Sequence, residues 1–165
     1  MSIASNAKEI LAQFTREVWS EGNIDASDNY IADKYTIRHD PGDPWEGREL
    51  DLAGYKERVK ILRAAFPDQC FDIQGLFEDG DAVVMTWFWS ATHQGDIPGF
   101  PATGQRVKMS GATVYYFDGS RLTGHWQITD RLGVFQQLRQ AAAGGEHGHD
   151  QTHVHDYHGG HFPAP

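Results

Sequence analysis

The chain has 165 residues, of which 39% are hydrophobic and 12% aromatic, and it carries a formal net charge of −9. This length is enough for one domain with a single core and too short for two. The acidic balance argues against nucleic acid or an anionic membrane as the main partner, because both bind basic surfaces. The sequence contains no apolar run of about 18 residues, and its first residues lack the order of a secretory signal, in which basic residues precede apolar ones. Its single cysteine, Cys70, cannot form an internal disulfide. We therefore expect a cytoplasmic protein.

The first part of the chain is predicted to be helical. A first helix carries one apolar stripe that ends before Gly22, formed by Ala7, Ile10, Leu11, Phe14 and Val18. A short helical turn over 25–32 leads into a strand in which Tyr35, Ile37 and His39 share one face by alternation. His39 is therefore expected to face the same side as apolar residues.

A segment rich in Pro and Gly, 40–47, separates this strand from a second helix. Its aromatic residue, Trp45, suits the rim of a pocket. Apolar residues then repeat at helical spacing over 52–66, and Pro67 ends this helix.

The remainder is predicted to form consecutive antiparallel strands followed by a helix over 131–143. The expected strands cover 71–77, 82–93, 107–117 and 121–130, with hairpin turns at 78–81 and 118–119. Along the second strand, one face is formed by Val83, Met85, Trp87, Trp89, Ala91 and His93. The opposite face is also partly apolar, which is typical of a central strand in a curved sheet covered by helices. The long connection 94–106 is interpreted either as a functional lid or as a mobile surface loop.

The last predicted strand brings a carboxylate next to apolar side chains. By alternation, one face carries Leu122, Gly124, Trp126, Ile128 and Asp130, and the other carries His125. An aspartate at the edge of an apolar space has its pKa raised toward the range of a general base. Asp130 is therefore the first candidate for catalysis, although an aspartate directly before a helix is also a good N-cap.

The C-terminal segment 144–165 is rich in histidine and contains no Lys or Arg. We expect a domain over 1–143 and a flexible tail over 144–165. Two His-x-His pairs in the tail, His147 with His149 and His153 with His155, could bind Zn²⁺, Ni²⁺ or Cu²⁺. The alternative is a solvated appendage that binds metal only incidentally.

Three segments together resemble the SnoaL-like polyketide cyclase, or ester cyclase, family. They are Phe66-Pro67-Asp68, the strand and loop from Thr92 to Gly104, and His125-Trp126 with Asp130 before a helix containing Gln136-Gln137-Leu138. The resemblance runs from about Lys8 to Gln140. It implies a nuclear transport factor 2-like α+β barrel, in which N-terminal helices cover a cone-shaped, curved antiparallel sheet. The order of predicted elements, helices first and strands after, fits this fold independently.

The resemblance also implies a function, namely cofactor-independent acid/base catalysis on a small apolar carbonyl substrate such as a polyketide-like ester. Asp130 would act as the acid/base in a reaction of the lyase or isomerase type, in a homodimeric protein. His39 and His93 are candidate proton relays, with core histidines as the alternative. Trp45, Trp87, Trp89, Tyr115, Trp126 and Phe100 are the candidate substrate-binding residues, and core packing is the alternative for the tryptophans.

Two other functions fit the same fold. One is a small-ligand-binding or dimerisation module without catalysis. The other is a hydrolase of the epoxide hydrolase type, which would need an Asp-Arg-Asp arrangement in the cavity. We rank the hydrolase low, because Arg121 and Arg131 are predicted to lie outside the cavity.

Overall fold

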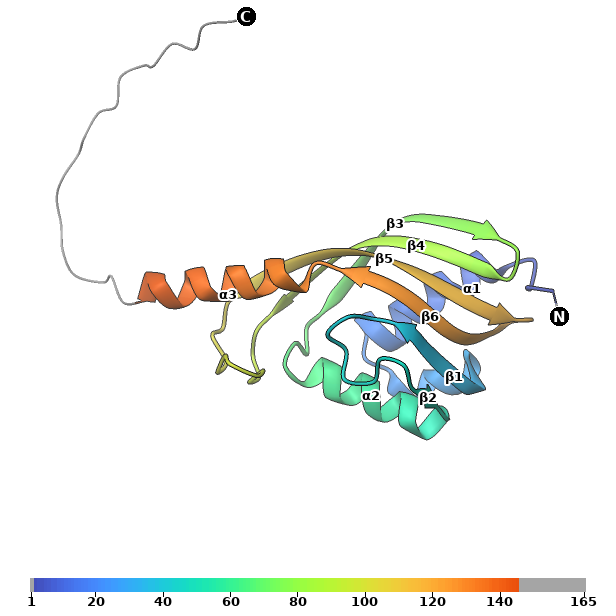
Figure 1. Ribbon diagram of the computed structural model, residues 1–165, viewed down its shortest axis with the longest axis horizontal. Coiled ribbons are helices and arrows are strands. Elements are labelled where there is room, and N and C mark those ends of the chain that lie inside the picture. Colours follow the sequence, from blue (N-terminus) through green and yellow to red (C-terminus); the bar gives the residue numbers. More distant parts are fainter. Residues whose placement is uncertain (1, 146–165) are drawn as a thin grey trace, which may run out of the picture.

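The computed structural model describes residues 2–145 and has an α+β fold (Figure 1). The order of its elements is α1 (Ala7–Phe14), η1 (Thr15–Ser20), η2 (Ile24–Asn29), β1 (Ile31–His39), β2 (Glu49–Leu50), α2 (Leu52–Ala64), β3 (Cys70–Asp79), β4 (Ala82–Thr92), β5 (Arg106–Asp118), β6 (Arg121–Thr129) and α3 (Arg131–Gly145). The predicted elements are thus confirmed, except that β1 already begins within the helical turn expected over 25–32 and that the short strand β2 was not predicted. The first helix continues beyond α1 as the π-helical segment η1, which carries Thr15 and Trp19 toward the interior.

The six strands form one curved, unclosed sheet in the order β2-β1-β6-β5-β4-β3. The strands β3 to β6 pair with their sequence neighbours in antiparallel fashion, as the hairpin turns predicted. The expectation of a wholly antiparallel sheet is wrong at one place, because β1 pairs with β6 in parallel. The chain between β1 and β6 contains the other strands and α2, which is long enough for a parallel return.

The hydrophobic core lies between the helices and one face of the sheet. The inward residues of β4 that alternation predicted are all buried there, from Val83 to His93. Trp87 needs unusual room, because a Cβ on Gly111 of the neighbouring strand would lie 2.5 Å from its indole ring. The absence of a side chain at Gly111 therefore allows Trp87 to lie across β5.

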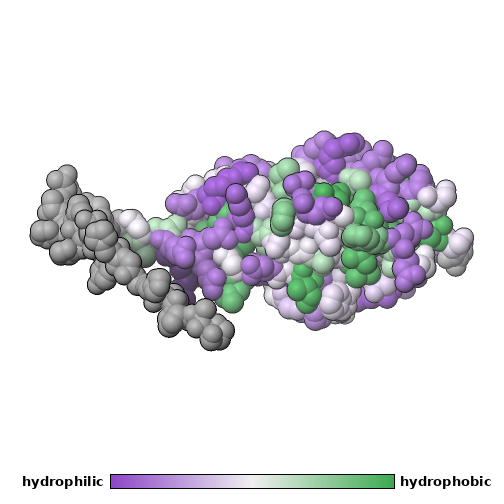
Figure 2. All heavy atoms as spheres, turned by 90° about the horizontal axis from the view of Figure 1, so that it is seen from above, coloured by the Kyte–Doolittle hydropathy of each residue, from purple (hydrophilic) through white to green (hydrophobic). Residues whose placement is uncertain are grey.

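The other face of the sheet exposes apolar side chains. Phe88 is 55%, Trp126 40% and Ile128 49% exposed. The view from above shows apolar side chains reaching the surface among hydrophilic ones (Figure 2). Among residues 2–145 no helix is long and apolar enough to cross a membrane.

Asp68 links the ends of two long strands to the end of α2. Its carboxylate accepts hydrogen bonds from the backbone N–H and the hydroxyl of Thr92, both at 2.7 Å, and from Arg106 at 3.2 Å. The hydrogen bonds from Thr92 hold the pKa of Asp68 below its usual value, with a smaller contribution from Arg106. The Phe66-Pro67-Asp68 segment therefore has a structural role at this corner.

Candidate active site

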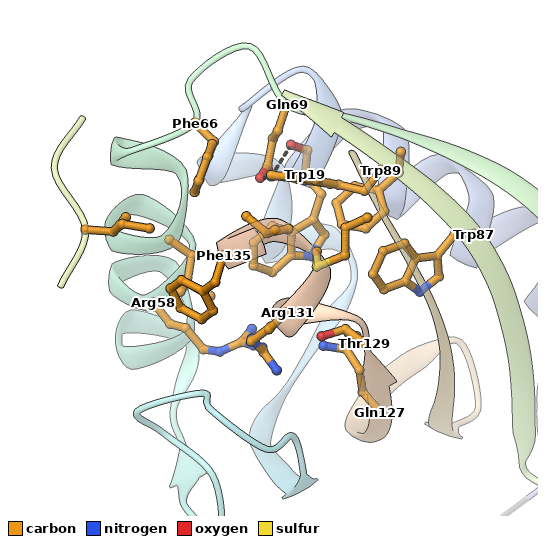
Figure 3. Close-up of a pocket in the computed structure, with 15 residues that line it drawn as sticks. Trp19, Arg58, Phe66, Gln69, Trp87, Trp89, Gln127, Thr129, Arg131 and Phe135 are labelled. Atoms are coloured by element: carbon orange, nitrogen blue, oxygen red, sulfur yellow. Dashed lines mark hydrogen bonds between the residues drawn. The ribbon is translucent and has the colours of Figure 1, made fainter. Parts of the chain in front are cut away.

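A cavity of about 200 Å³ lies between α2, α3, η1 and the covered face of the sheet. In Figure 3 the indoles of Trp19, Trp87 and Trp89 lie together on one side, and Arg58, Arg131 and Gln127 lie on the other. We call this space the outer chamber. A dry cavity of roughly 150 Å³ holds a benzene molecule, so the outer chamber has room for one substituted ring.

A smaller cavity of about 60 Å³, the inner chamber, lies next to the outer one. The two chambers share Trp19, Arg58, Phe71 and Gln127 as walls. The inner chamber is more polar, because its lining includes His125 and three tyrosines, Tyr35, Tyr55 and Tyr115. Together the chambers combine an aromatic space with a polar end, which is the usual composition of a small-molecule site.

Asp40, which is fully buried, is the centre of the polar end. Its Oδ2 accepts hydrogen bonds from His125 Nε2 and Gln127 Nε2, both at 3.1 Å, and from Arg58 at 3.4 Å. Its Oδ1 lies 2.8 Å from Arg131 Nη2. Asp40 therefore joins α2, β6 and the start of α3 through a single carboxylate.

These partners decide the charge of Asp40. Burial alone would raise its pKa, but the hydrogen bond from His125 and the positive charge of Arg131 outweigh burial and lower the pKa to about 2. Asp40 is therefore ionised at neutral pH. Arg58 is in turn held by Asp43, whose Oδ2 lies 2.6 Å from Arg58 Nη2.

The ionised Asp40 also fixes the tautomer of His125. Burial lowers the pKa of His125, against the opposing effect of its hydrogen bond with Asp40, so the ring is neutral at neutral pH. A carboxylate only accepts hydrogen bonds, so Nε2 carries the ring proton and donates a hydrogen bond to Asp40. Nδ1 then accepts a hydrogen bond from the Tyr35 hydroxyl at 2.8 Å. Tyr35, His125 and Asp40 thus form one directed chain of hydrogen bonds.

The predicted inward orientation of Asp130 is wrong. Asp130 is exposed, and its Oδ1 accepts a hydrogen bond from the backbone N–H of Gly133 at 2.9 Å, which is the geometry of an N-cap on α3. Trp126 also lies on the exposed face, whereas His125 is buried. The reason is a register shift between Tyr116 and Phe117, which leaves Thr123 of β6 without a partner and reverses the alternation after Leu122.

His39 is likewise misplaced by the alternation rule. A register shift between Ile37 and His39 turns His39 to the outer face, where it stacks on Trp126 with ring centroids 4.8 Å apart. The expectation that His39 shares a face with Tyr35 and Ile37 is therefore wrong. The same shift turns the next residue, Asp40, to the inside.

Other predicted site residues divide between the cavity and its surroundings. Trp87 and Trp89 line the outer chamber and Tyr115 lines the inner chamber. Trp45 is packed against the core outside both chambers. Phe100 stacks on Phe135, a wall of the outer chamber, with ring centroids 5.7 Å apart.

His93 is buried, but it lines neither chamber. Its Nδ1 accepts a hydrogen bond from the backbone N–H of Thr103 at 3.3 Å, and its ring lies against Phe66. His93 therefore holds the loop between β4 and β5. The proposed metal ligands His147, His149, His153 and His155 lie outside the described residues.

The prediction missed the charged residues of the site, Asp40, Asp43, Arg58 and Arg131. One signal was present in α2, where Arg58 stands at helical spacing within the apolar stripe of Tyr55, Val59 and Leu62. A charged residue in such a stripe requires a buried partner of opposite charge. The assignment of Arg131 to the outside is also wrong, because its side chain contacts Asp40.

Helices covering a curved sheet, with a cavity between the two layers, define the α+β fold of nuclear transport factor 2-like proteins. The chain matches the family model of the SnoaL-like polyketide cyclases over residues 9–138. The protein therefore belongs to the SnoaL-like polyketide cyclase family. No match was found among curated proteins.

Solved structures agree with this assignment. A candidate polyketide cyclase from Acidithiobacillus ferrooxidans is 85% identical, with a TM-score of 0.81 over 86% of this chain and 99% of that one. IdmH, a candidate polyketide cyclase from Streptomyces antibioticus, is 23% identical, with a TM-score of 0.68 over 81% of this chain and 98% of that one. A SnoaL-like protein from Jannaschia sp. CCS1 is 18% identical, with a TM-score of 0.69 over 82% and 93% of the two chains. The last two show the shared fold.

Proposed function

We propose that the protein catalyses an acid/base reaction on a small apolar carbonyl compound, with His125 as the acid/base and Asp40 as its partner. The observation that carries this proposal is the neutral His125, hydrogen-bonded to an ionised and fully buried Asp40 beside an aromatic chamber. A general base works best when it is unprotonated near neutral pH and has a partner that stabilises its protonated form. His125 and Asp40 meet both conditions.

The reaction that suits these groups is an intramolecular aldol closure, as in a polyketide-like ester. The carbon between two carbonyl groups loses its proton to His125 Nδ1. The resulting enolate carbon then bonds to the carbon of a third carbonyl group elsewhere in the same molecule. The new alkoxide then takes the proton back from His125. Tyr35, which occupies Nδ1 in the resting site, must release it when substrate binds. The product is an isomer of the substrate, so no cofactor enters the balance.

Asp40 stabilises the imidazolium that forms in this reaction. Its own pKa of about 2 makes it a weak base, which favours His125 over Asp40 as the proton acceptor. Arg131 and Arg58 hold the carboxylate in position from two directions. We therefore assign Asp40, Arg58 and Arg131 as positioning residues.

The experiment is hydrogen–deuterium exchange at the acidic carbon of a cyclic β-keto ester, ethyl 2-oxocyclohexanecarboxylate, followed by NMR in D₂O. We expect the wild-type protein to accelerate the exchange, and His125→Gln to lose about 100-fold or more of this acceleration, the range of a general base. Asp40→Asn should retain part of the wild-type acceleration. Asp130→Asn is the matched control, because it changes an exposed carboxylate and Asn is also a good N-cap. Equal acceleration by wild type and His125→Gln would refute the proposal.

The hydrolase alternative gains one feature from the structure, because Arg58 does contact both Asp40 and Asp43. An epoxide hydrolase of this type needs a carboxylic acid that donates a proton to the epoxide oxygen. The low pKa of Asp40 leaves it without that proton at neutral pH. The charge state therefore favours the cyclase-type reaction.

If the chain only binds its ligand, the β-keto ester will bind without accelerated exchange in any variant.

We also propose that two copies associate through the exposed apolar face of the sheet around Phe88, Trp126 and Ile128, because patches of this kind mark protein contacts.

A further inference from the structure

The inner chamber contains hydrogen-bond donors that the acid/base reaction leaves unused. Tyr55 is 1% and Tyr115 is 7% exposed, and both line this chamber. The oxygen of Tyr55 accepts a hydrogen bond from Trp19 Nε1 at 3.3 Å, which leaves its own proton free to donate. Within residues 2–145 the hydroxyl of Tyr115 has no hydrogen-bond partner.

Arg58 adds a third donor to the same chamber. Its Nε and Nη2 are used by Asp43 and Asp40, but within the described part of the chain its Nη1 donates to no side chain or carbonyl. Arg58 is 3% exposed and lines both chambers. The positive charge of Arg58 therefore lies where the outer chamber meets the inner chamber that contains the tyrosines.

The two tyrosines remain donors over the whole accessible pH range. Burial raises the pKa of Tyr55 to about 12 and raises the pKa of Tyr115 well above its usual value. Neither hydroxyl can act as a base at neutral pH. Neither hydroxyl is among the fully enclosed side-chain atoms that lack a partner in the described residues, so both can donate to a ligand that supplies acceptor oxygens in the chamber.

We propose that Tyr55, Tyr115 and Arg58 form an oxyanion subsite, which binds the enolate oxygen of the substrate in the inner chamber while its apolar body occupies the outer chamber. The proposal rests on the proposed function, because it places the enolate next to His125, another wall of the inner chamber. Donors positioned in a site without water stabilise a negative oxygen far more than they do in solution. A 60 Å³ space is large enough for one such oxygen and its carbon, or for about two water molecules.

The subsite also defines the class of substrate. It must carry an enolisable carbonyl at one end and an apolar part of about one ring, because the outer chamber has only about 200 Å³. The outer chamber is open on one side, so a molecule of several fused rings would extend out of it toward solvent. We therefore expect monocyclic β-dicarbonyl compounds to bind better than polycyclic ones.

The test uses 4-nitrophenolate, a planar anion whose phenolate oxygen shares its negative charge with the ring and the nitro group, and nitrobenzene, which has the same ring without the phenolate oxygen. Their equilibrium dissociation constants are measured for the wild type, Tyr55→Phe, Tyr115→Phe and the double variant. A hydrogen bond to a charged group contributes about 1.5 to 3 kcal/mol, so each variant should bind 4-nitrophenolate about 10-fold more weakly or worse. Binding of nitrobenzene should not change. Tyr30→Phe is the control, because Tyr30 is equally buried, donates to Glu17 and lines neither chamber.

The outcomes separate the subsite from its alternatives. Equal weakening of both ligands would mean that the tyrosines only pack the cavity, and unchanged binding of both would mean that the inner chamber holds water only. A third arm with benzoate identifies a carboxylate site: tyrosine-dependent binding of benzoate without binding of 4-nitrophenolate would overturn the enolate assignment. Among the described residues Tyr115→Phe breaks no side-chain hydrogen bond, so this variant is expected to fold and the test does not depend on Tyr55→Phe.

The same measurements distinguish this proposal from the proposed function. Tyrosine-dependent binding of 4-nitrophenolate, together with exchange that is insensitive to His125→Gln, would refute the acid/base role of His125 and leave the subsite in place. Exchange that depends on His125, with binding that is insensitive to both tyrosines, would refute the subsite alone.

Discussion

Replacement of Arg131 by Met tests the charge state of the site. Folding lowers the pKa of Asp40 from 3.8 to about 2, which corresponds to about 2 kcal/mol in favour of its ionised form. His125 and Arg131 supply this effect against the cost of burial. We expect Arg131→Met to lower the free energy of unfolding by about 1 to 2 kcal/mol at pH 7. The lower part of this range allows for the removal of a positive charge from the first turn of α3, where it is unfavourable.

The pH dependence of this stability difference shows whether the ionised Asp40 causes it. Because the pKa of Asp40 is lowered by folding, the ionised carboxylate stabilises the protein above about pH 4, and this contribution declines as the pH falls toward 2. The difference between wild type and Arg131→Met should therefore shrink by about half between pH 7 and pH 3. Urea unfolding at both pH values measures it, with Arg139→Met, an exposed position on α3, as the control. A difference of the same size at pH 3 and pH 7, or none relative to Arg139→Met, would refute the assigned charge state.

Four other changes have defined outcomes. Asp130→Ala should lower the free energy of unfolding by about 1 kcal/mol through loss of the N-cap, without affecting deuterium exchange; loss of exchange in a folded variant would restore the catalytic role of Asp130. Trp126→Glu should give a monomer in size-exclusion chromatography with light scattering, and an unchanged mass would exclude the exposed sheet face as the contact. Gly111→Ala should displace the Trp87 ring and weaken binding of nitrobenzene in the outer chamber, so unchanged affinity would contradict its placement. Removal of 146–165 should abolish Zn²⁺ binding measured by calorimetry without lowering the melting temperature, and retained binding would argue against the histidine tail as the metal site.

The sequence was sufficient for the fold because its periodicity is strong where the strands are long and regular. β4 and β5 pair without a register shift along their whole length, and the predicted turns at 78–81 and 118–119 set the order of β3 with β4 and of β5 with β6. The helices follow from apolar stripes that end at Gly22 and Pro67. No local pattern revealed the parallel pairing of β1 with β6, because that pairing depends on residues about 90 positions apart.

The site was predicted less well, because alternation assumes a regular strand. It placed Trp87, Trp89 and Tyr115 on the covered face, where they line the chambers. It failed on β6 and at the end of β1, where an unpaired residue interrupts the period of two. A bulge leaves no clear signal in a single sequence, since both faces of these strands carry apolar residues.

The two irregular strands explain how the site forms. At the end of β1 the inward residues Ile37 and Asp40, the latter just past the strand, are three positions apart, and in β6 the inward residues Leu122 and His125 are also three apart. A regular strand would turn Asp40 or His125 to the exposed face, and their hydrogen bond would be impossible. Bulges often redirect side chains next to active sites. The pairing of Asp40 with His125 thus depends on one extra residue in each of two neighbouring strands, Arg38 beside β1 residue Ile37 and Thr123 in β6, because uninterrupted alternation along this sequence would turn one member of the pair outward.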